Sequence, residues 1–83
     1  MFIISKTIKG SEYQYTRNIM IKCDSEKQAR FLCECMNENN YSLSDDFKLK
    51  ENELYYVYKI DKYDTEPNYR ISIRKNKFYI VEI

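Results

Sequence analysis

The sequence predicts a single α+β domain, residues 1–83, in which an antiparallel sheet of about five to six strands carries one amphipathic helix on one face. Apolar side chains recur at helical spacing in residues 24–40, whereas the segments before and after alternate at the two-residue spacing of strands. Short clusters of turn-forming residues separate these segments. The expected order is therefore two strands, one helix and four strands.

Residues 2–23 are predicted to form the first antiparallel hairpin. Gly10 and Ser11 would make a two-residue turn, because glycine at the first central position suits a type II′ loop. This register sets Phe2 opposite Ile19 and gives the hairpin one mostly apolar face.

The helix is predicted from a change of period after the first hairpin. Ser25 and Gln28 have the spacing of a capping box, in which each side chain accepts a hydrogen bond from a backbone N–H group of the first turn. The apolar positions follow at i, i+3, i+4 and i+7, and two further residues are expected to widen the stripe. The stripe comprises Ala29, Leu32, Cys33 and Met36, with Phe31 and Cys35 beside it.

Residues 41–83 return to the two-residue alternation and predict four more strands. A short second helix starting at Ser44 is an alternative for residues 41–50, because Asp45 and Asp46 suit a first helical turn. The expected turns lie at residues 51–52, 64–67 and 75–76.

These turns give the last four strands one shared apolar face. Tyr58 would lie opposite Ile73, and Ile73 would lie opposite Phe78 across the last turn. Leu54 and Tyr56 then face the core together with Tyr58. Tyr55 and every second residue after it would face away from the helix. Asp61 would meet Arg70 on that outer face.

The composition removes the common catalytic and cofactor sites. Without histidine, triads of the Ser/His or Cys/His type cannot form, and a chain with one glycine cannot build a glycine-rich phosphate loop. Cys33 and Cys35 stand two residues apart on the helix, so their thiols point apart and are expected to act as small apolar groups. The sequence therefore predicts no enzyme, no cofactor and no metal site.

The outer face of the last strands interleaves aromatic rings with cations, which makes it a candidate partner-binding surface. Three interpretations compete: a solvated face, a protein-binding face anchored by Tyr and Arg, and a platform that stacks unpaired bases. The formal net charge of +1 gives no strong overall attraction to nucleic acid. The candidate residues on this face are Tyr55, Lys59, Tyr63, Arg70, Arg74 and Tyr79.

An acidic segment in the middle of the chain is the other candidate surface. Such a run usually forms the wet side of a helix, but carboxylates can also imitate a phosphate path and occupy the basic groove of a nucleic-acid enzyme. The candidate residues here are Asp45, Asp46, Glu51 and Glu53.

In its Lys, Asn, Ile and Tyr content, its single glycine and its lack of His and Trp, the chain resembles small accessory proteins of phages and mobile elements of AT-rich genomes. Anti-CRISPR and other anti-defence inhibitors belong to that group. The resemblance implies a non-enzymatic module that inhibits or regulates a larger protein, such as a CRISPR effector. The alternative function is binding of single-stranded DNA or RNA.

The remaining expectations concern location and assembly. Three cysteines make no even disulfide framework, and the first ten residues lack a long apolar core with a cleavage site, which favours a reducing cytoplasm. No apolar run approaches the roughly 18 residues of a membrane span, so no membrane partner is expected. The chain is expected to be a monomer or a homodimer formed through an uncapped edge strand.

Overall fold

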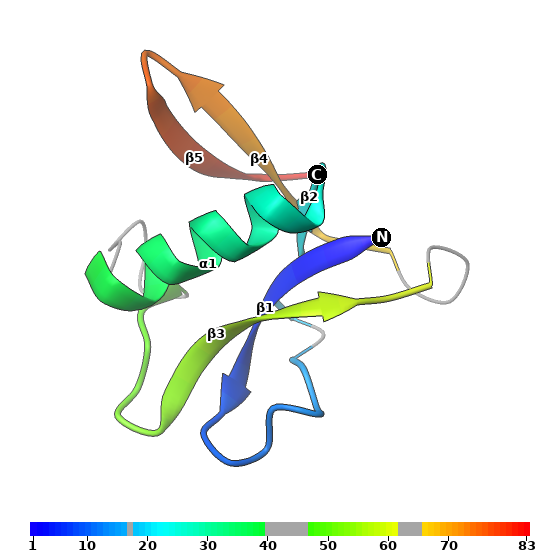
Figure 1. The fold of residues 1–83 in the computed structure, drawn as a ribbon, viewed down its shortest axis with the longest axis vertical. Coiled ribbons are helices and arrows are strands. Elements are labelled where there is room, and N and C mark those ends of the chain that lie inside the picture. Colours follow the sequence, from blue (N-terminus) through cyan, green and yellow to red (C-terminus); the bar gives the residue numbers. More distant parts are fainter. Residues whose placement is uncertain (17, 40–46, 62–65) are drawn as a thin grey trace.

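The computed structural model describes residues 1–16, 18–39, 47–61 and 66–83. Within these ranges the chain forms one helix and a five-stranded sheet, which confirms the predicted α+β class (Figure 1). No strand begins in residues 47–50, and residues 40–46 lie outside the described ranges. The elements are β1 (Phe2–Ile8), β2 (Ile21–Cys23), α1 (Glu26–Asn39), β3 (Glu53–Lys59), β4 (Tyr69–Arg74) and β5 (Lys77–Glu82).

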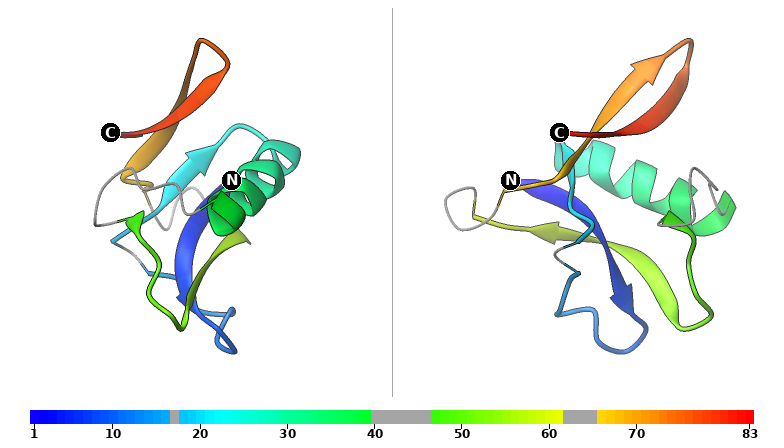
Figure 2. Two further views of the ribbon diagram at one scale, coloured as in Figure 1. Left: turned by 90° about the vertical axis from the view of Figure 1, so that its left-hand side faces the viewer. Right: turned by 180° about the vertical axis from the view of Figure 1, so that it is seen from behind.

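The strand order of the sheet is β3-β1-β2-β4-β5. The central part of the sheet is antiparallel, with β1 paired to β2 on one side and to β3 on the other. The pair β2 and β4 runs parallel, and β4 with β5 forms an antiparallel hairpin. Figure 2 shows this hairpin extending from one end of the sheet, away from β1 and β3.

The core lies between α1 and one face of β1, β2 and β3. The predicted stripe of Ala29, Leu32, Cys33 and Met36 is buried, with Leu32 only 5% exposed. It packs in one cluster with side chains of the three strands, among them Ile4, Ile21 and Tyr55. Phe31 does not widen this stripe as predicted, because it is 64% exposed on the outer side of the helix.

The start of α1 is capped as the sequence predicts. The Gln28 backbone N–H donates to Ser25 Oγ at 3.1 Å, and Gln28 Oε1 accepts from the Asp24 backbone N–H at 2.7 Å. The reciprocal bond thus reaches one residue further back than in the usual capping box. Two N–H groups at the helix entrance are satisfied by this pair of side chains.

The predicted first hairpin is wrong in register. Phe2 pairs with Cys23 and not with Ile19, and the described residues between β1 and β2, 9–16 and 18–20, form a wide connection in place of a two-residue turn. The Ser11 N–H bonds to the Ile8 carbonyl at 2.9 Å, so Gly10, with φ of +89°, occupies the third position of a turn as in type II.

Hydroxyl groups of β1 hold the wide connection against the face of the sheet that α1 does not cover. Ser5 Oγ lies within hydrogen-bond distance of the Thr16 and Ile19 carbonyls, at 2.9 and 2.5 Å. Thr7 Oγ1 likewise reaches carbonyls of this connection, at 2.9 and 2.6 Å. Each hydroxyl carries one proton, so it donates to one of its two carbonyls at a time.

Strand β3 pairs with β1 and not with the chain that follows it. Its register places Val57 opposite Ile4 and Tyr55 opposite Lys6, so the predicted pairing of Tyr58 with Ile73 is wrong. The pairing also reverses the predicted faces of β3. Tyr55 and Val57 belong to the core side, and Tyr58 lies on the opposite side.

The last hairpin forms in the predicted register. Ile73 pairs with Phe78, and Lys75 and Asn76 make the two-residue turn. Both turn residues have positive φ, 49° and 63°, which is the geometry of a type I′ turn.

Replacing Leu32 with Ala is expected to lower the unfolding free energy by about 2 to 4 kcal/mol, because the deletion leaves a cavity between helix and sheet. The exposed Ile73, at 65%, supplies the control, and Ile73→Ala should change stability by no more than about 0.5 kcal/mol. Urea unfolding followed by circular dichroism measures both values. Equal losses in the two variants would contradict the described packing of α1.

Candidate functional site

The β4–β5 hairpin is joined to the sheet by a short pairing. Only Ile21 with Tyr69 and Lys22 with Arg70 pair between β2 and β4. Beyond Arg70 the hairpin continues as a two-stranded ribbon (Figure 2). Both faces of that ribbon are therefore available near its tip.

Asn68 fixes the base of this hairpin. Its Oδ1 accepts from the Met20 N–H at 2.8 Å, and its Nδ2 donates to the Asn18 carbonyl at 2.7 Å. Its backbone N–H donates to the Met20 carbonyl at 3.1 Å. A single asparagine thus links the start of β4 to the residues just before β2.

The face of the hairpin directed away from the core carries cations and one tyrosine. Ile71, Phe78 and Ile80 pack against the core, so strand alternation directs their neighbours to the opposite side. We call that side the basic face. It comprises Lys22, Arg70, Ser72 and Arg74, then Lys77, Tyr79 and Val81, together with Lys75 of the turn.

The basic face contains a shallow depression. Ser72, Arg74, Lys75, Tyr79 and Val81 line it, and Tyr79 is 42% exposed. The predicted site residues Arg70, Arg74 and Tyr79 are therefore brought to one face, with the two arginines exposed. Arg and Tyr are the side chains most often found as anchors of protein interfaces.

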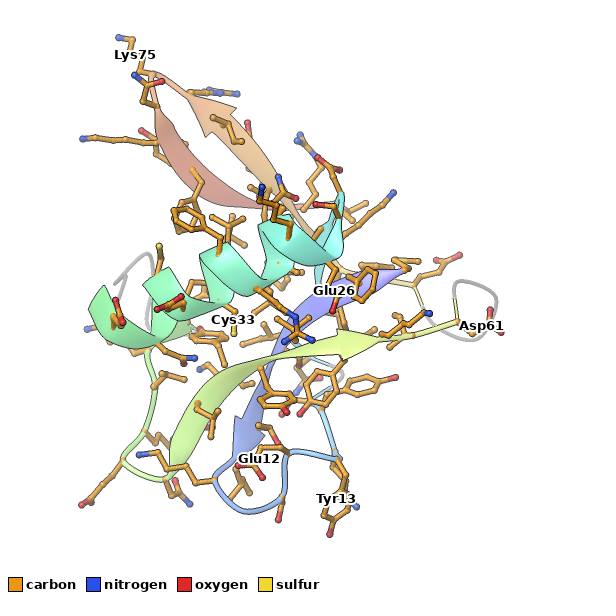
Figure 3. All side chains as sticks on the ribbon, in the orientation of Figure 1. Glu12, Tyr13, Glu26, Cys33, Asp61 and Lys75 are labelled. Carbon is orange, nitrogen blue, oxygen red and sulfur yellow. The ribbon has the colours of Figure 1, made fainter. Side chains whose placement is uncertain are left out.

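Asp61 does not lie opposite Arg70, contrary to the expected register. It follows β3, which is separated from β4 by β1 and β2. Figure 3 shows Asp61 at the side of the molecule and Lys75 at the tip of the hairpin. The expected meeting of Asp61 with Arg70 is therefore wrong.

The opposite face of the hairpin is apolar and incompletely covered. Ile71, Phe78 and Ile80 are partly buried against the core, whereas Ile73 near the tip is 65% exposed. Ile83, just after β5, is 66% exposed. Cations on one side and exposed isoleucine on the other make this hairpin amphipathic.

Tyr55 is a core residue, so its prediction as an exposed contact is wrong. Its side chain is 2% exposed, and its hydroxyl donates to the Phe47 carbonyl. Burial, with a smaller effect of Glu53, raises the pKa of the Tyr55 phenol well above its usual range. The Asn37 carboxamide bonds both backbone groups of Tyr55, accepting from its N–H at 2.7 Å and donating to its carbonyl at 2.8 Å.

A tyrosine cluster on the reverse side of β3 was missed by the sequence analysis. The Tyr58 ring centroid lies 5.2 Å from that of Tyr15 and 5.4 Å from that of Tyr56. The Tyr58 hydroxyl donates to the Gln14 carbonyl at 3.0 Å, and burial raises the pKa of its phenol. Alternation places Lys59 on the other side of the strand, so β3 does not interleave rings with cations.

The acidic candidates do not form a continuous acidic path in the described part of the chain. Glu51 and Glu53 line a shared depression with Lys9 and Lys50, and Glu53 Oε1 accepts from the Lys50 N–H at 2.8 Å. Their charges are thus mixed with lysines. Asp45, Asp46 and Tyr63 lie outside the described residues.

The three cysteines are free thiols. Burial raises the pKa of Cys23 to about 12, with smaller effects of Asp24 and Cys33. Burial also raises the pKa of Cys33 to about 11, which Arg30 and Asn37 partly offset. Cys33 is in the core and Cys35 is half-buried, and the described residues contain no cluster of three or more potential metal ligands.

Alkaline pH is expected to destabilise the protein through Cys23 and Cys33. Their pKa values are raised from an ordinary 9.0, so above pH 9 the unfolded chain loses thiol protons that the folded chain keeps. The stabilising contribution is complete below pH 9 and falls as pH rises toward the folded values. Urea unfolding between about pH 8 and about pH 10.5 measures the loss, since free thiols titrate in this range.

A variant with both Cys23 and Cys33 replaced by Ala provides the control for this pH dependence. It should lose stability overall but retain only the alkaline decline caused by the raised pKa values of Tyr55 and Tyr58. An identical slope in the two proteins would contradict a thiol contribution.

Comparison with protein-family models, with curated proteins and with solved structures gives no significant match. Within the described ranges, no helix has the length and hydropathy needed to cross a lipid bilayer.

Proposed function

We propose that this protein is a non-enzymatic binding module that inhibits or regulates a larger protein, and that its β4–β5 hairpin makes the contact. The observation that carries the proposal is the position of this amphipathic hairpin. It extends beyond the helix-covered body, with the basic face on one side and the exposed Ile73 on the other. Such a ribbon can enter a cleft and contact both of its walls.

The basic face favours a partner surface that carries carboxylates. Lys22, Arg70, Arg74, Lys75 and Lys77 are all exposed, and strand alternation places Glu82 on the other face. Opposite charges on two approaching surfaces accelerate association and fix their orientation. Tyr79, which lines the depression, supplies apolar contact area together with a hydroxyl group.

The apolar side of the hairpin favours a protein partner over a nucleic acid. Ile73 is 65% exposed close to the tip, and it has no role in neutralising phosphates. An apolar pocket of a partner protein would remove this side chain from water, which contributes about 1.5 to 3 kcal/mol for full burial. The whole-chain resemblance to anti-defence proteins supports a larger target such as a CRISPR effector, and three free cysteines support a reducing cytoplasm.

Binding of single-stranded nucleic acid is the second candidate function. Five cations around one exposed tyrosine could neutralise phosphates and stack one base. Because counterions are released on binding, the affinity for an oligonucleotide would fall steeply with salt.

Affinity capture from the native host, with nuclease treatment, tests the proposed function. Arg74→Glu is expected to reduce capture of a specific protein partner by about tenfold or more, because it reverses a charge in the depression. Lys59→Glu is the matched control, since Lys59 is an exposed cation on β3, at the other edge of the sheet. It should leave capture almost unchanged.

Two outcomes would contradict a protein-binding hairpin. Equal loss of capture in the Arg74 and Lys59 variants would show a nonspecific charge effect. Capture that disappears with nuclease treatment, together with salt-sensitive binding of an oligonucleotide by the purified protein, would instead support the second candidate.

A further inference from the structure

The β4–β5 hairpin meets the rest of the sheet over a short length of β4. Two residue pairs join β4 to β2, at Tyr69 and Arg70. Apolar side chains of the hairpin also pack against the core, but the hydrophobic effect has no preferred direction. The angle at which the hairpin leaves the body therefore depends on the hydrogen bonds at its base, which are directional.

Asn68, directly before β4, uses all its kinds of polar group at this base. Its Oδ1 accepts from the Met20 N–H at 2.8 Å, and its Nδ2 donates to the Asn18 carbonyl at 2.7 Å. Its backbone N–H donates to the Met20 carbonyl at 3.1 Å, and its own carbonyl accepts from the Ile83 N–H at 3.0 Å. Both strands of the hairpin, β4 directly and β5 through Ile83, are thus tied at one residue.

The groups that the Asn68 carboxamide contacts are held by the body of the protein. Met20 is 2% exposed, and the neighbouring carbonyl of Ile19 lies 2.5 Å from Ser5 Oγ of β1. The bonds of the carboxamide lie just before β2, so they extend the attachment beyond the two residue pairs. The carboxamide therefore connects the hairpin to a part of the wide connection that β1 fixes.

A small rotation at this base produces a large displacement at the tip. β4 contains six residues, so its end at Arg74 lies roughly 20 Å from Asn68. A rotation of about 10° would then move the tip by about 3 Å, which exceeds the roughly 0.5 Å that a preorganised binding site tolerates. The orientation at the base consequently decides whether the basic face and Ile73 reach their contacts together.

We propose that Asn68 is the positioning residue of the β4–β5 hairpin, whose carboxamide fixes the angle between the hairpin and the body. Asn68 lies at the opposite end of β4 from Arg74, so it acts through the hairpin and not by contact with the partner. Its effect on binding rests on the proposed function. Its effect on orientation is a property of the free protein and is measured without a partner.

Asn68→Ala and Asn18→Ala form a matched pair of variants. The first removes both bonds of the carboxamide, whereas the second leaves them intact, because Asn18 takes part through its backbone carbonyl. Residual dipolar couplings of the backbone amides in a weakly aligned sample report the orientation of the hairpin relative to β1 and β3. A single alignment should describe hairpin and body in the wild type and in Asn18→Ala, but not in Asn68→Ala.

Partner capture by the same variants measures the consequence for binding. Asn68→Ala should reduce capture by about fivefold or more, because a smaller fraction of the molecules holds the hairpin in the binding orientation. Asn18→Ala should leave capture almost unchanged.

Asn68→Asp separates positioning from a general loss of stability, and it also serves if Asn68→Ala does not fold. A carboxylate accepts from the Met20 N–H but cannot donate to the Asn18 carbonyl, whereas the protonated acid does both. The hairpin of this variant should deviate from the wild-type orientation at pH 7 and return to it as the pH falls to about 4, where a carboxyl group takes up its proton. Comparison with the wild type at each pH removes the effects of other titrating groups.

Three results would overturn this inference. One is an unchanged hairpin orientation in both Asn68 variants at pH 7. Another is an equal change of orientation in Asn68→Ala and Asn18→Ala. The third is a changed orientation with undiminished capture, in a protein whose capture Arg74→Glu does weaken. Capture that Arg74→Glu leaves unchanged would instead contradict the proposed function, and the dipolar couplings would then decide the inference alone.

Discussion

The structure depends on the burial of the central residues of β1. Five consecutive residues of this strand, 3–7, are buried although they include a serine, a lysine and a threonine. Burial of an unsatisfied hydroxyl would cost about 1 to 3 kcal/mol, so each hydroxyl requires an acceptor. Ser5 and Thr7 find theirs in carbonyls of residues 9–20, and Lys6 Nζ donates to the Lys48 carbonyl at 2.7 Å. The same hydrogen bonds that make β1 burial tolerable therefore hold the wide connection in place.

The position of the wide connection determines the rest of the sheet. Because its described residues cover one face of β1, β2 begins only at Ile21 and contains three residues. A strand of that length pairs with few residues of β4, and the hairpin consequently extends past it as a ribbon. Asn68 strengthens the joint with contacts to Asn18 and Met20. The exposed position of the β4–β5 hairpin is thus a consequence of the polar side chains buried in β1.

Elements that depend on residues close together in the sequence were predicted correctly, whereas the pairing of strands that are far apart in the sequence was not. The capping residues of α1 and the turn at Lys75 and Asn76 act within a few positions, so the helix and last hairpin were predicted correctly. Residues 54–60, LYYVYKI, place tyrosines and aliphatic side chains on both faces of the strand, and a tyrosine is suited to either face. Periodicity therefore could not determine which side chains of β3 face the core. An error of one position in the register moves every side chain of the strand to the opposite face. Likewise, nothing in a sequence marks Ser5 and Thr7 as hydrogen-bond donors to a distant connection.

The same distinction explains which of the candidate residues share a face as predicted. Arg70, Arg74 and Tyr79 belong to one hairpin whose register its own turn sets, so they share a face wherever the hairpin lies in the sheet. Tyr55 depended on the pairing of β3, and its ring entered the core when that strand paired with β1. The hairpin is nevertheless held at its base by Asn68 and against the core by Ile71, Phe78 and Ile80, so its tip is presented in a defined orientation. A defined orientation reduces the loss of affinity that ordering the hairpin against a partner would otherwise bring.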